Sequence, residues 1–456
     1  MAPVYADEAG FAAQQPARAR LLLTLAISIF LLRGALAIAV VPPWQHPDEP
    51  QHFALVHVLA RQTRLDLTDR RDLDLERRIL ISMAAHGWWR HYGEALPHPL
   101  PTDFGQVPEH ISTTSTMPPV YYILGARVLK LSGVEDLVAQ AYVLRWMALA
   151  IAVPILLCIW AGTRRLFGSW VAGGATLLTA LHPQFVLFST AVNPAVLVNL
   201  CGAVFWWQGA RLVTGRPALV SLAILTGTAA VGVFTKRVAA PLVPMLLVIP
   251  MIAWGSGRLG TWRATRPAVV GAAGGLALAA VGGVIWFDGE VGRLTDYWSY
   301  ALTLVWAERA RDWTFFQDFS AGLFNSAWLR AGWLRYPAPA AWLTLIRLVV
   351  VAALVGWLVG LWRQEMAAWR MGFILAAALL AIQTAGVYVG IYMNGYGPQG
   401  HYLFPVFGPF MAMLWVGLHQ CFPRRHRAYV TVSVVAFFAA FDLVGWTHVI
   451  VPAFLG

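Results

Sequence analysis

Long apolar stretches alternate with shorter polar segments along almost the whole chain. Stretches of roughly 17 to 25 apolar residues are long enough to cross the ~30 Å hydrocarbon core of a bilayer as helices. In lipid, a helix satisfies its own backbone hydrogen bonds, whereas an open strand does not. We therefore predict an all-α polytopic membrane protein with about 11 transmembrane helices, at residues 21–41, 138–162, 169–191, 194–213, 217–235, 238–254, 267–287, 340–362, 371–393, 403–420 and 429–450.

Composition agrees with this pattern and narrows the set of partners. Hydrophobic residues make up 59% of the 456 positions, charged residues only 12%, and the mean hydropathy is +0.62. The net charge of +11 could suggest nucleic acid, but most arginines lie in short loops between the predicted helices. Positive charge in such loops marks the cytoplasmic side. We therefore expect no nucleic acid partner.

The arginines also orient the predicted helices. With the short loops inside, the amino terminus is cytoplasmic and the long connections 42–137 and 288–339 face outward. Residues 1–20 are then a cytoplasmic N-terminal segment, and 21–456 form a single transmembrane domain. The composition is rich in alanine and arginine and has only two lysines, Lys130 and Lys236, which favours a bacterial inner (plasma) membrane. The arginines that agree are Arg18, Arg20, Arg164, Arg165, Arg211, Arg216, Arg258, Arg263, Arg266, Arg363, Arg370, Arg424, Arg425 and Arg427.

An acidic and imidazole-rich cluster follows the first apolar stretch. The segment Trp44-Gln45-His46-Pro47-Asp48-Glu49-Pro50-Gln51-His52 places two carboxylates and two imidazoles beside the predicted membrane surface. Residues 52–67 have helical periodicity, which predicts a helix along the interface. One explanation of the carboxylates is that Asp48 or Glu49 merely caps that helix, with Pro50 in its first turn. The other is a reaction site outside the cytoplasm.

The rest of the long connections offers fewer chemical signals. Residues 66–78 are a mixed charge run, which we interpret as a solvated face. Residues 118–122, Pro-Pro-Val-Tyr-Tyr, open an apolar segment too short to span, and they predict a second interfacial helix or a wall of a ligand cavity. The second connection interleaves aromatic residues with arginine. Half-buried amphipathic helices explain most of these aromatic residues, although one or two tryptophans could select a sugar.

Several motifs together resemble a known family. These motifs are residues 43–53, residues 118–122, Val192-Asn193-Pro194, Thr235-Lys236 and residues 399–405, Gln-Gly-His-Tyr-Leu-Phe-Pro. In this order they are similar to bacterial membrane proteins catalogued as domain of unknown function 2142, of the GT-C glycosyltransferase superfamily. The resemblance covers nearly the whole chain. It departs from the family at Ala195, where Asp is frequent, and at His401, where Arg is frequent.

This resemblance implies a GT-C-like fold and a glycosyltransferase. Such an enzyme moves a sugar from a polyprenyl-phosphate donor to a glycan, lipid or protein acceptor at the extracytoplasmic face. We prefer Asp48 as the catalytic base and Glu49 as the group that orients the acceptor or an imidazole. Lys236 and Arg237 are suited to meet the charge of the departing phosphate. The predicted substrate-binding set is His46, His52, Tyr121, Tyr122, Arg145, Asn193, Lys236, Arg237, Gln399, His401 and Tyr402.

Three alternatives stay open at this level. First, His46, Asp48, Glu49 and His52 are acceptable metal ligands, but their spacing matches no strong zinc signature, so we expect no required cofactor and keep a divalent metal as an alternative. Second, a structural ion pair explains Arg145, and the intramembrane Arg33, as well as a ligand contact does. Third, a transporter or flippase of lipid-linked glycans, or a structural subunit of an envelope complex, competes with the transferase.

Overall fold

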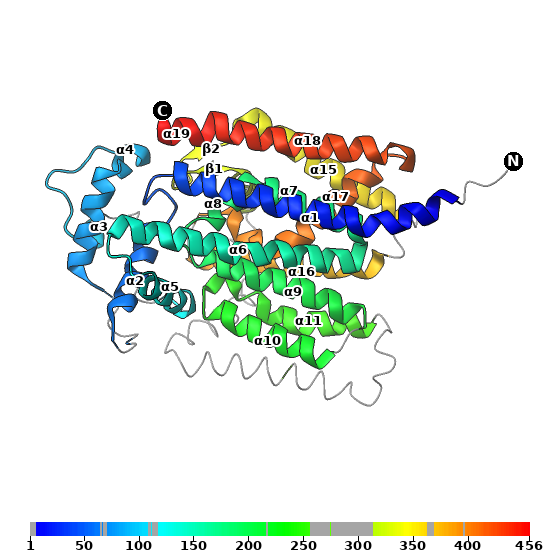
Figure 1. Cartoon of the computed structure of the whole chain (residues 1–456), viewed down its shortest axis with the longest axis horizontal. Coiled ribbons are helices and arrows are strands. Elements are labelled where there is room, and N and C mark those ends of the chain that lie inside the picture. The colour runs from blue at the N-terminus through cyan, green and yellow to red at the C-terminus, as the bar shows by residue number, and fades with distance from the viewer. Residues whose placement is uncertain are drawn as a thin grey trace.

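The computed structural model is a bundle of long helices with a cluster of short helices at one end (Figure 1). It describes residues 6–63, 66, 71–107, 111, 117–215, 218–255, 274, 313–362, 369–394 and 397–456. The amino terminus lies at the opposite end of the bundle from the short helices α2 to α4. The predicted all-α membrane architecture is confirmed, with a two-stranded β-hairpin as the one β element in the described part.

Most predicted spans correspond to observed helices. In chain order these are α1 (Ala6–Val40), α6 (Leu137–Phe167), α9 (Ala195–Val213), α10 (Ala218–Val233), α11 (Leu242–Gly255), α15 (Ala340–Trp362), α16 (Arg370–Asn394), η6 (Gly400–Val406) with α17 (Phe407–Gln420), and α18 (Arg427–Val444) with η8 (Gly445–Ile450) and α19 (Val451–Leu455). The short turns η2 (Arg237–Ala239) and η7 (Arg424–His426) precede α11 and α18.

The described residues do not confirm the predicted number of about 11 spans. Within the described residues, eight helices are long and apolar enough to cross a membrane, or nine if one bent pair counts as a span. That pair is α7 (Ser169–Leu181) and α8 (Pro183–Ser189), which meet at 70°. Its bend follows from Pro183, because proline cannot donate the next helical hydrogen bond. The apolar helix at 219–233 is shorter than a span, and the predicted span 267–287 lies outside the described residues.

The first long connection folds into short helices packed beside the bundle: α2 (Glu49–Arg61), α3 (Leu73–Ala85), α4 (Trp88–Tyr92), η1 (Phe104–Gln106) and α5 (Val120–Ser132). Helix α2 begins earlier than the predicted 52–67 segment because Pro50 occupies its first turn. Helix α5 begins at the predicted position, directly after Pro119. The helices α3 and α4 carry no signal strong enough for us to have predicted them.

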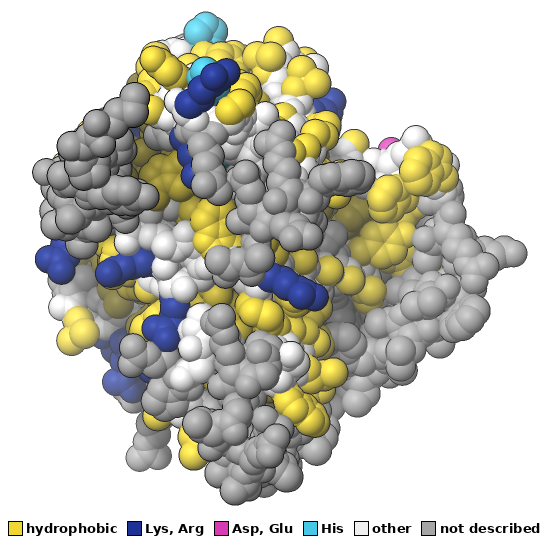
Figure 2. All heavy atoms as spheres, turned by 90° about the vertical axis from the view of Figure 1, so that its right-hand side faces the viewer, with side chains coloured by type: hydrophobic (Ala, Val, Ile, Leu, Met, Phe, Trp, Pro, Cys, Tyr) yellow, Lys and Arg dark blue, Asp and Glu magenta, His cyan; other side chains and the backbone are white. Residues whose placement is uncertain are grey.

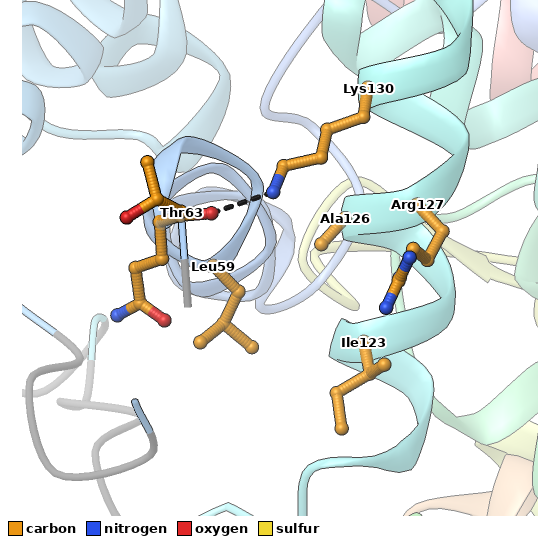
Figure 3. A pocket seen from close by; sticks show the side chains of 7 residues that line it. Leu59, Thr63, Ile123, Ala126, Arg127 and Lys130 are labelled. Atoms are coloured by element: carbon orange, nitrogen blue, oxygen red, sulfur yellow. Dashed lines mark hydrogen bonds between the residues drawn. The ribbon is translucent and has the colours of Figure 1, made fainter. Parts of the chain in front are cut away.

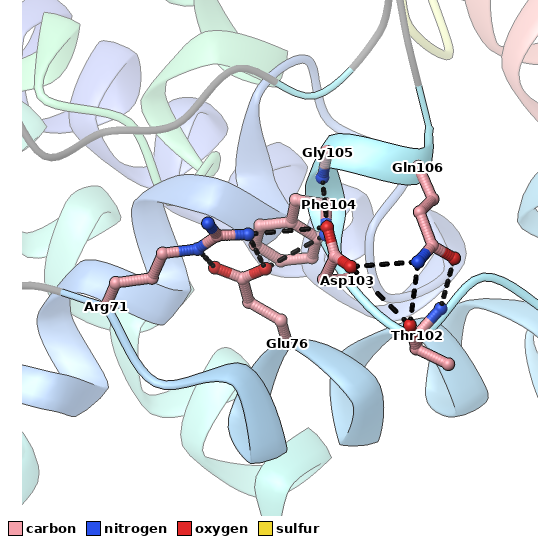
Figure 4. Close-up of polar contacts among 7 residues, drawn as sticks. All are labelled: Arg71, Glu76, Thr102, Asp103, Phe104, Gly105 and Gln106. Atoms are coloured by element: carbon pink, nitrogen blue, oxygen red, sulfur yellow. Dashed lines mark hydrogen bonds and ion pairs between the residues drawn. The ribbon is translucent and has the colours of Figure 1, made fainter.

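The charge run 66–78 is not only a solvated face. Glu76 is buried, and it accepts two hydrogen bonds from Arg71, at 2.7 and 3.0 Å, and one from the backbone N–H of Phe104 at 2.9 Å. Arg71 also approaches Asp103 at 3.4 Å (Figure 4). The carboxylate of Glu76 therefore joins α3 to η1 and fixes the shape of the connection.

The second long connection is described from Trp313 onward. It contains α14 (Trp313–Trp328) and the antiparallel pair β1 (Arg330–Ala331) and β2 (Tyr336–Pro337). Trp313 and Phe316 are exposed and Trp328 is buried, whereas Phe315, Trp333 and Tyr336 are partly buried. The half-buried surface that we predicted therefore describes only part of this set. The aromatic residues Trp298, Tyr300 and Trp306 lie outside the described residues.

Arg33 of α1 lies deep inside the bundle and has a structural role. It forms an ion pair with Asp442 of α18 and donates a hydrogen bond to the backbone carbonyl of Ala180. A lone charge at this depth is costly, and a carboxylate partner removes most of that cost. Of the two alternatives for Arg33, the structural ion pair is therefore the one observed.

Candidate active site

The turn between α1 and α2 holds the acidic cluster in an unusual backbone conformation. Trp44 has φ of 72° and Asp48 has φ of 63°, both in the left-handed region. Such conformations cost of order 1–3 kcal/mol and persist where surrounding contacts impose them. Here the indole N–H of Trp44 donates to the Ser82 hydroxyl at 3.0 Å, and the indole of Trp333 donates to the Trp44 carbonyl at 2.8 Å. The turn is thus held between α3 and the β-hairpin.

Asp48 occupies the N-cap position of α2 without capping it. Its side chain accepts no hydrogen bond from the helix backbone. Instead, the Gln51 amide donates to Asp48 Oδ1 at 3.1 Å, and the carboxylate interacts electrostatically with Lys236. Removal from bulk water raises the pKa of Asp48, and this effect outweighs the opposing influence of Lys236. The capping explanation therefore does not account for this carboxylate.

Glu49 has a different environment from its neighbour. It is fully buried, and Arg145 of α6 holds both carboxylate oxygens at 2.7 Å. Burial alone would raise the pKa of Glu49, but the charge and hydrogen bonds of Arg145 lower it. Arg145 also donates to the carbonyls of Val41 and Pro42, at 2.6 and 2.8 Å. The guanidinium is occupied by protein groups, so the structural ion pair is the observed alternative for Arg145 as well.

Lys236 is the cation that interacts electrostatically with Asp48. It follows α10, and its ammonium donates to Asn193 Oδ1 at 3.2 Å. Asn193 Oδ1 in turn accepts the backbone N–H of Ala195 at the start of α9. Removal from bulk water lowers the pKa of Lys236, and Asp48 opposes this effect. Asn193 therefore positions Lys236. These two residues belong to separate sequence motifs, and the fold brings them together.

The two histidines of the cluster are both buried. Burial, with Arg145 as the second cause, lowers the pKa of His46 to about 3. Burial and then Lys236 lower the pKa of His52 well below its ordinary value. His52 Nδ1 lies 2.8 Å from the Tyr122 hydroxyl, whereas Nε2 has no hydrogen-bond partner among the described residues. Tyr121 packs edge-on against Tyr122, with ring centroids 5.6 Å apart.

The remaining predicted residues border the site less directly. His401 is buried, stacks on Phe188 at 4.1 Å, and lies within electrostatic range of Lys236. Gln399 and Tyr402 are half-buried at the start of η6, and Arg237 is exposed. The structure thus brings His401 toward Lys236 and leaves Arg237 at the surface.

Gly400, the first residue of η6, serves packing. A Cβ on Gly400 would lie 2.2 Å from the backbone of Ala327 in α14. Gly400 N–H also donates to the Ser326 hydroxyl at 2.8 Å. The close backbone approach that glycine permits here is therefore to α14 rather than to a ligand.

The potential metal ligands are largely committed to other groups. Across the described ranges, no three His, Cys, Asp or Glu side chains are grouped to hold a metal ion. Glu49 faces Arg145, and His52 faces Tyr122. The Nε2 atoms of His46 and His52 are buried and have no hydrogen-bond partner among the described residues, and the carboxylate of Asp48 accepts its hydrogen bond from Gln51.

Sequence reasoning missed the residues that support the site. Ser82, Gln51 and Trp333 hold the strained turn or its carboxylate. Gln51 was within the recognised motif and could have been included on that basis. Ser82 and Trp333 are distant in sequence from the turn, and nothing in their local pattern distinguishes them.

Comparisons with known proteins agree with this picture over part of the chain. The sequence model of a family described as dolichyl-phosphate-mannose-protein mannosyltransferase matches residues 116–286. This segment contains Tyr121, Tyr122, Arg145, Asn193 and Lys236 but not the acidic turn. No curated protein matches the chain.

Three solved structures share a distant likeness. ArnT from Cupriavidus metallidurans in the apo state has 13% identity and a TM-score of 0.42, over 96% of this chain and 65% of that one. The Archaeoglobus fulgidus oligosaccharyltransferase in complex with Zn and sulfate has 12% identity and a TM-score of 0.43, over 95% of this chain and 52% of that one. The oligosaccharyltransferase AglB from the same organism, in complex with an inhibitory peptide and a dolichol-phosphate, has 12% identity and a TM-score of 0.45. The match covers 94% of this chain and 55% of that one. The chain spans about half to two thirds of the length of these proteins.

The narrower resemblance to domain of unknown function 2142 stays a prediction. Through the match at residues 116–286, the predicted similarity to membrane glycosyltransferases of the GT-C superfamily is confirmed.

Proposed function

We propose that this protein transfers a sugar from a polyprenyl-phosphate-linked donor to a hydroxyl group of an envelope acceptor at the extracytoplasmic membrane face. The observation that carries the proposal is the electrostatic interaction between Asp48, which caps no helix, and Lys236, a cation held by Asn193. Both residues are partly exposed, so a ligand can reach them. The family whose model matches residues 116–286 is described as using dolichyl-phosphate-mannose, which supports a polyprenyl-phosphate-linked sugar as the donor here.

In the proposed reaction Asp48 is the general base. It accepts the proton of the acceptor hydroxyl while that oxygen attacks the anomeric carbon of the sugar. The bond between the anomeric carbon and the phosphate oxygen breaks, and the polyprenyl phosphate leaves with the electron pair. The raised pKa of Asp48 makes the carboxylate a stronger base than an ordinary aspartate.

Lys236 and His52 serve the leaving phosphate. The Lys236 ammonium stabilises the negative charge that develops on the phosphate oxygen. His52 is neutral because its pKa is lowered. When the Tyr122 hydroxyl donates to Nδ1, the free Nε2 carries a proton and can donate a second hydrogen bond to the phosphate.

Glu49 and Arg145 have a positioning role in this proposal. Their buried ion pair fixes the first residue of α2 against the end of α1. Asp48 precedes Glu49 directly, so this pair determines where the base points. The proposal therefore assigns the two adjacent carboxylates separate roles.

The test compares Asp48→Asn with the native protein, using a synthetic polyprenyl-phosphate sugar and measuring the glycan product. Asparagine tolerates the left-handed backbone of this position, so the variant should fold normally. We expect transfer to fall by ~10²- to 10⁴-fold, the usual contribution of a general base. Asp103→Asn, which removes a carboxylate from the same connection, is the control. Native rates in Asp48→Asn would exclude catalysis by this residue.

The same experiment separates the transferase from the transporter alternative. If the native protein makes no product but moves lipid-linked glycan across proteoliposomes, a flippase replaces the transferase. A flippase needs ionisable groups along a path through the bundle. The intramembrane Arg33 is already engaged by Asp442, so this alternative gains no support from it. Activity after exhaustive chelation would separately exclude a required divalent metal.

A further inference from the structure

A cavity separate from the candidate active site lies between α2 and α5. It has a volume of about 130 Å³ and is lined by Leu59, Gln62, Thr63, Ile123, Ala126, Arg127 and Lys130 (Figure 3). The two helices run in parallel, because His52 meets Tyr122 near one end and Gln62 meets Lys130 at the other. Ten residues of helix separate His52 from Gln62, which corresponds to about 15 Å.

The cavity is positively charged, and only one of its two cations has a hydrogen-bond partner among the described residues. Its lining contains two cations and no carboxylate. The Lys130 ammonium donates to the Gln62 carbonyl at 2.6 Å, which is an ordinary way to satisfy the end of a helix. Arg127 is exposed and has no hydrogen-bond or ion-pair partner among the residues that the structure describes. One guanidinium is therefore available to an anion.

The surroundings of the cavity fit a membrane surface. Leu131 and Leu124 of α5 are 88% and 39% exposed, although large apolar side chains gain by leaving water. A helix that combines exposed leucines with Arg and Lys is typical of the interface, where cations meet lipid phosphates. Leu59, Ile123 and Ala126 are the apolar residues that line the cavity.

We propose that this cavity binds the phosphate group of an anionic membrane lipid, with Arg127 as its main ligand and Lys130 as the second. The volume supports a head group rather than a complete lipid-linked sugar. It is well below the ~300 Å³ at which pockets for drug-sized ligands begin. This lipid site is additional to the proposed transferase site and does not depend on it.

The test is native mass spectrometry of the detergent-purified protein titrated with phosphatidylglycerol. The variants are Arg127→Gln and the double variant Arg127→Gln with Lys130→Gln. The control is Arg77→Gln with Arg78→Gln, which removes the same charge from exposed positions of α3. A cation near an anionic lipid contributes about five-fold to binding, so we expect about five-fold weaker retention in the single variant and about 25-fold in the double variant. The control should retain the lipid.

Three results would overturn the proposal. Equal retention by native protein and double variant would show that the cavity is not the site. An equal loss in the α3 control would show non-specific attraction to charge. Displacement of the lipid by millimolar inorganic phosphate alone would identify a site for free phosphate. Phosphatidylcholine of the same chain length should bind equally to all variants, and unchanged melting temperatures would show that the exposed substitutions leave the fold intact.

Discussion

At the scale of single residues, Asp48 and Lys236 are a coupled acid and cation with opposite pKa shifts. Asp48 has its pKa raised above the ordinary 3.8, and Lys236 has its pKa lowered below the ordinary 10.5, in each case chiefly by removal from bulk water. The proposed reaction needs Asp48 deprotonated and Lys236 protonated. These requirements determine how activity should change with pH at acidic and at alkaline pH.

We predict a bell-shaped pH profile for sugar transfer. Activity should rise as pH increases through the raised pKa of Asp48 and fall as pH increases through the lowered pKa of Lys236. Arginine stays protonated at every accessible pH, so Lys236→Arg should lose the alkaline decline while it keeps the acidic one. Initial rates measured across the pH range check this prediction. An alkaline decline at the same pH in both proteins would contradict the role of Lys236.

A second residue-scale prediction concerns the buried ion pair of Glu49 and Arg145. Removal of one partner leaves an uncompensated buried charge, so Glu49→Gln or Arg145→Met alone should destabilise the protein by ~3–5 kcal/mol. The double variant should be less destabilised than the sum of the two, because neither charge is left alone. Thermal unfolding of the four proteins in one detergent measures this coupling.

Transfer rates of the same four proteins separate positioning from catalysis. If Glu49 only positions Asp48, the double variant should recover part of the activity lost in Glu49→Gln. Additive losses of stability and no recovery of activity would contradict the positioning role.

The residue scale also shows where sequence reasoning stops. The motif predicted that both acids matter, because two carboxylates beside a membrane surface are unusual. It could not assign their separate environments. The partner of Glu49 lies 96 positions away in α6, and Lys236 follows α10. The packing of these helices against the turn decides that Arg145 neutralises Glu49 and that Asp48 interacts with Lys236 instead.

At the scale of elements, residues of the candidate active site lie where apolar helices bend or are interrupted. The 70° bend between α7 and α8 places the segment with Asn193 beside α10, and His182 accepts the N–H of Phe185 to begin α8. The short helix η6 carries His401 and Tyr402 and is fixed to α14 through Gly400. The sequence predicted apolar length correctly at these places. It gave no measure of the bend, because the direction taken after Pro183 depends on what α8 packs against.

We predict that Gly400→Ala disturbs the site through η6. The added methyl would meet the Ala327 backbone at 2.2 Å, so η6 must shift, and overpacking of this kind costs ~1–3 kcal/mol. We expect lower thermal stability together with reduced transfer, since His401 and Tyr402 move with η6. Gly397→Ala is the matched control, because a Cβ there has no atom within 4 Å. Equal behaviour of the two variants would contradict this account.

At the scale of the whole molecule, the acidic turn lies far from the end of the bundle where α1 begins. The end that carries the amino terminus presents many Lys and Arg side chains and few acidic ones (Figure 2). The acidic turn and the helices α2 to α5 lie at the other end (Figure 1). By the positive-inside rule, the positive charge favours a cytoplasmic location for the end that carries the amino terminus, and we predict that the proposed active site faces outward. The sequence predicts this orientation from loop charge alone, because the charge of a loop arginine does not depend on the fold.

Cysteine accessibility can test this orientation directly. We predict that a membrane-impermeant maleimide labels Arg77→Cys, exposed on α3, in intact spheroplasts and labels Arg425→Cys, exposed at η7, only after permeabilisation. Both substitutions belong in a Cys421→Ser background, because Cys421 is partly exposed, whereas Cys158 and Cys201 are buried. Labelling of Arg425→Cys alone in intact spheroplasts would invert the topology. Asp48 would then face the cytoplasm, and a donor presented at the outer face could not reach it.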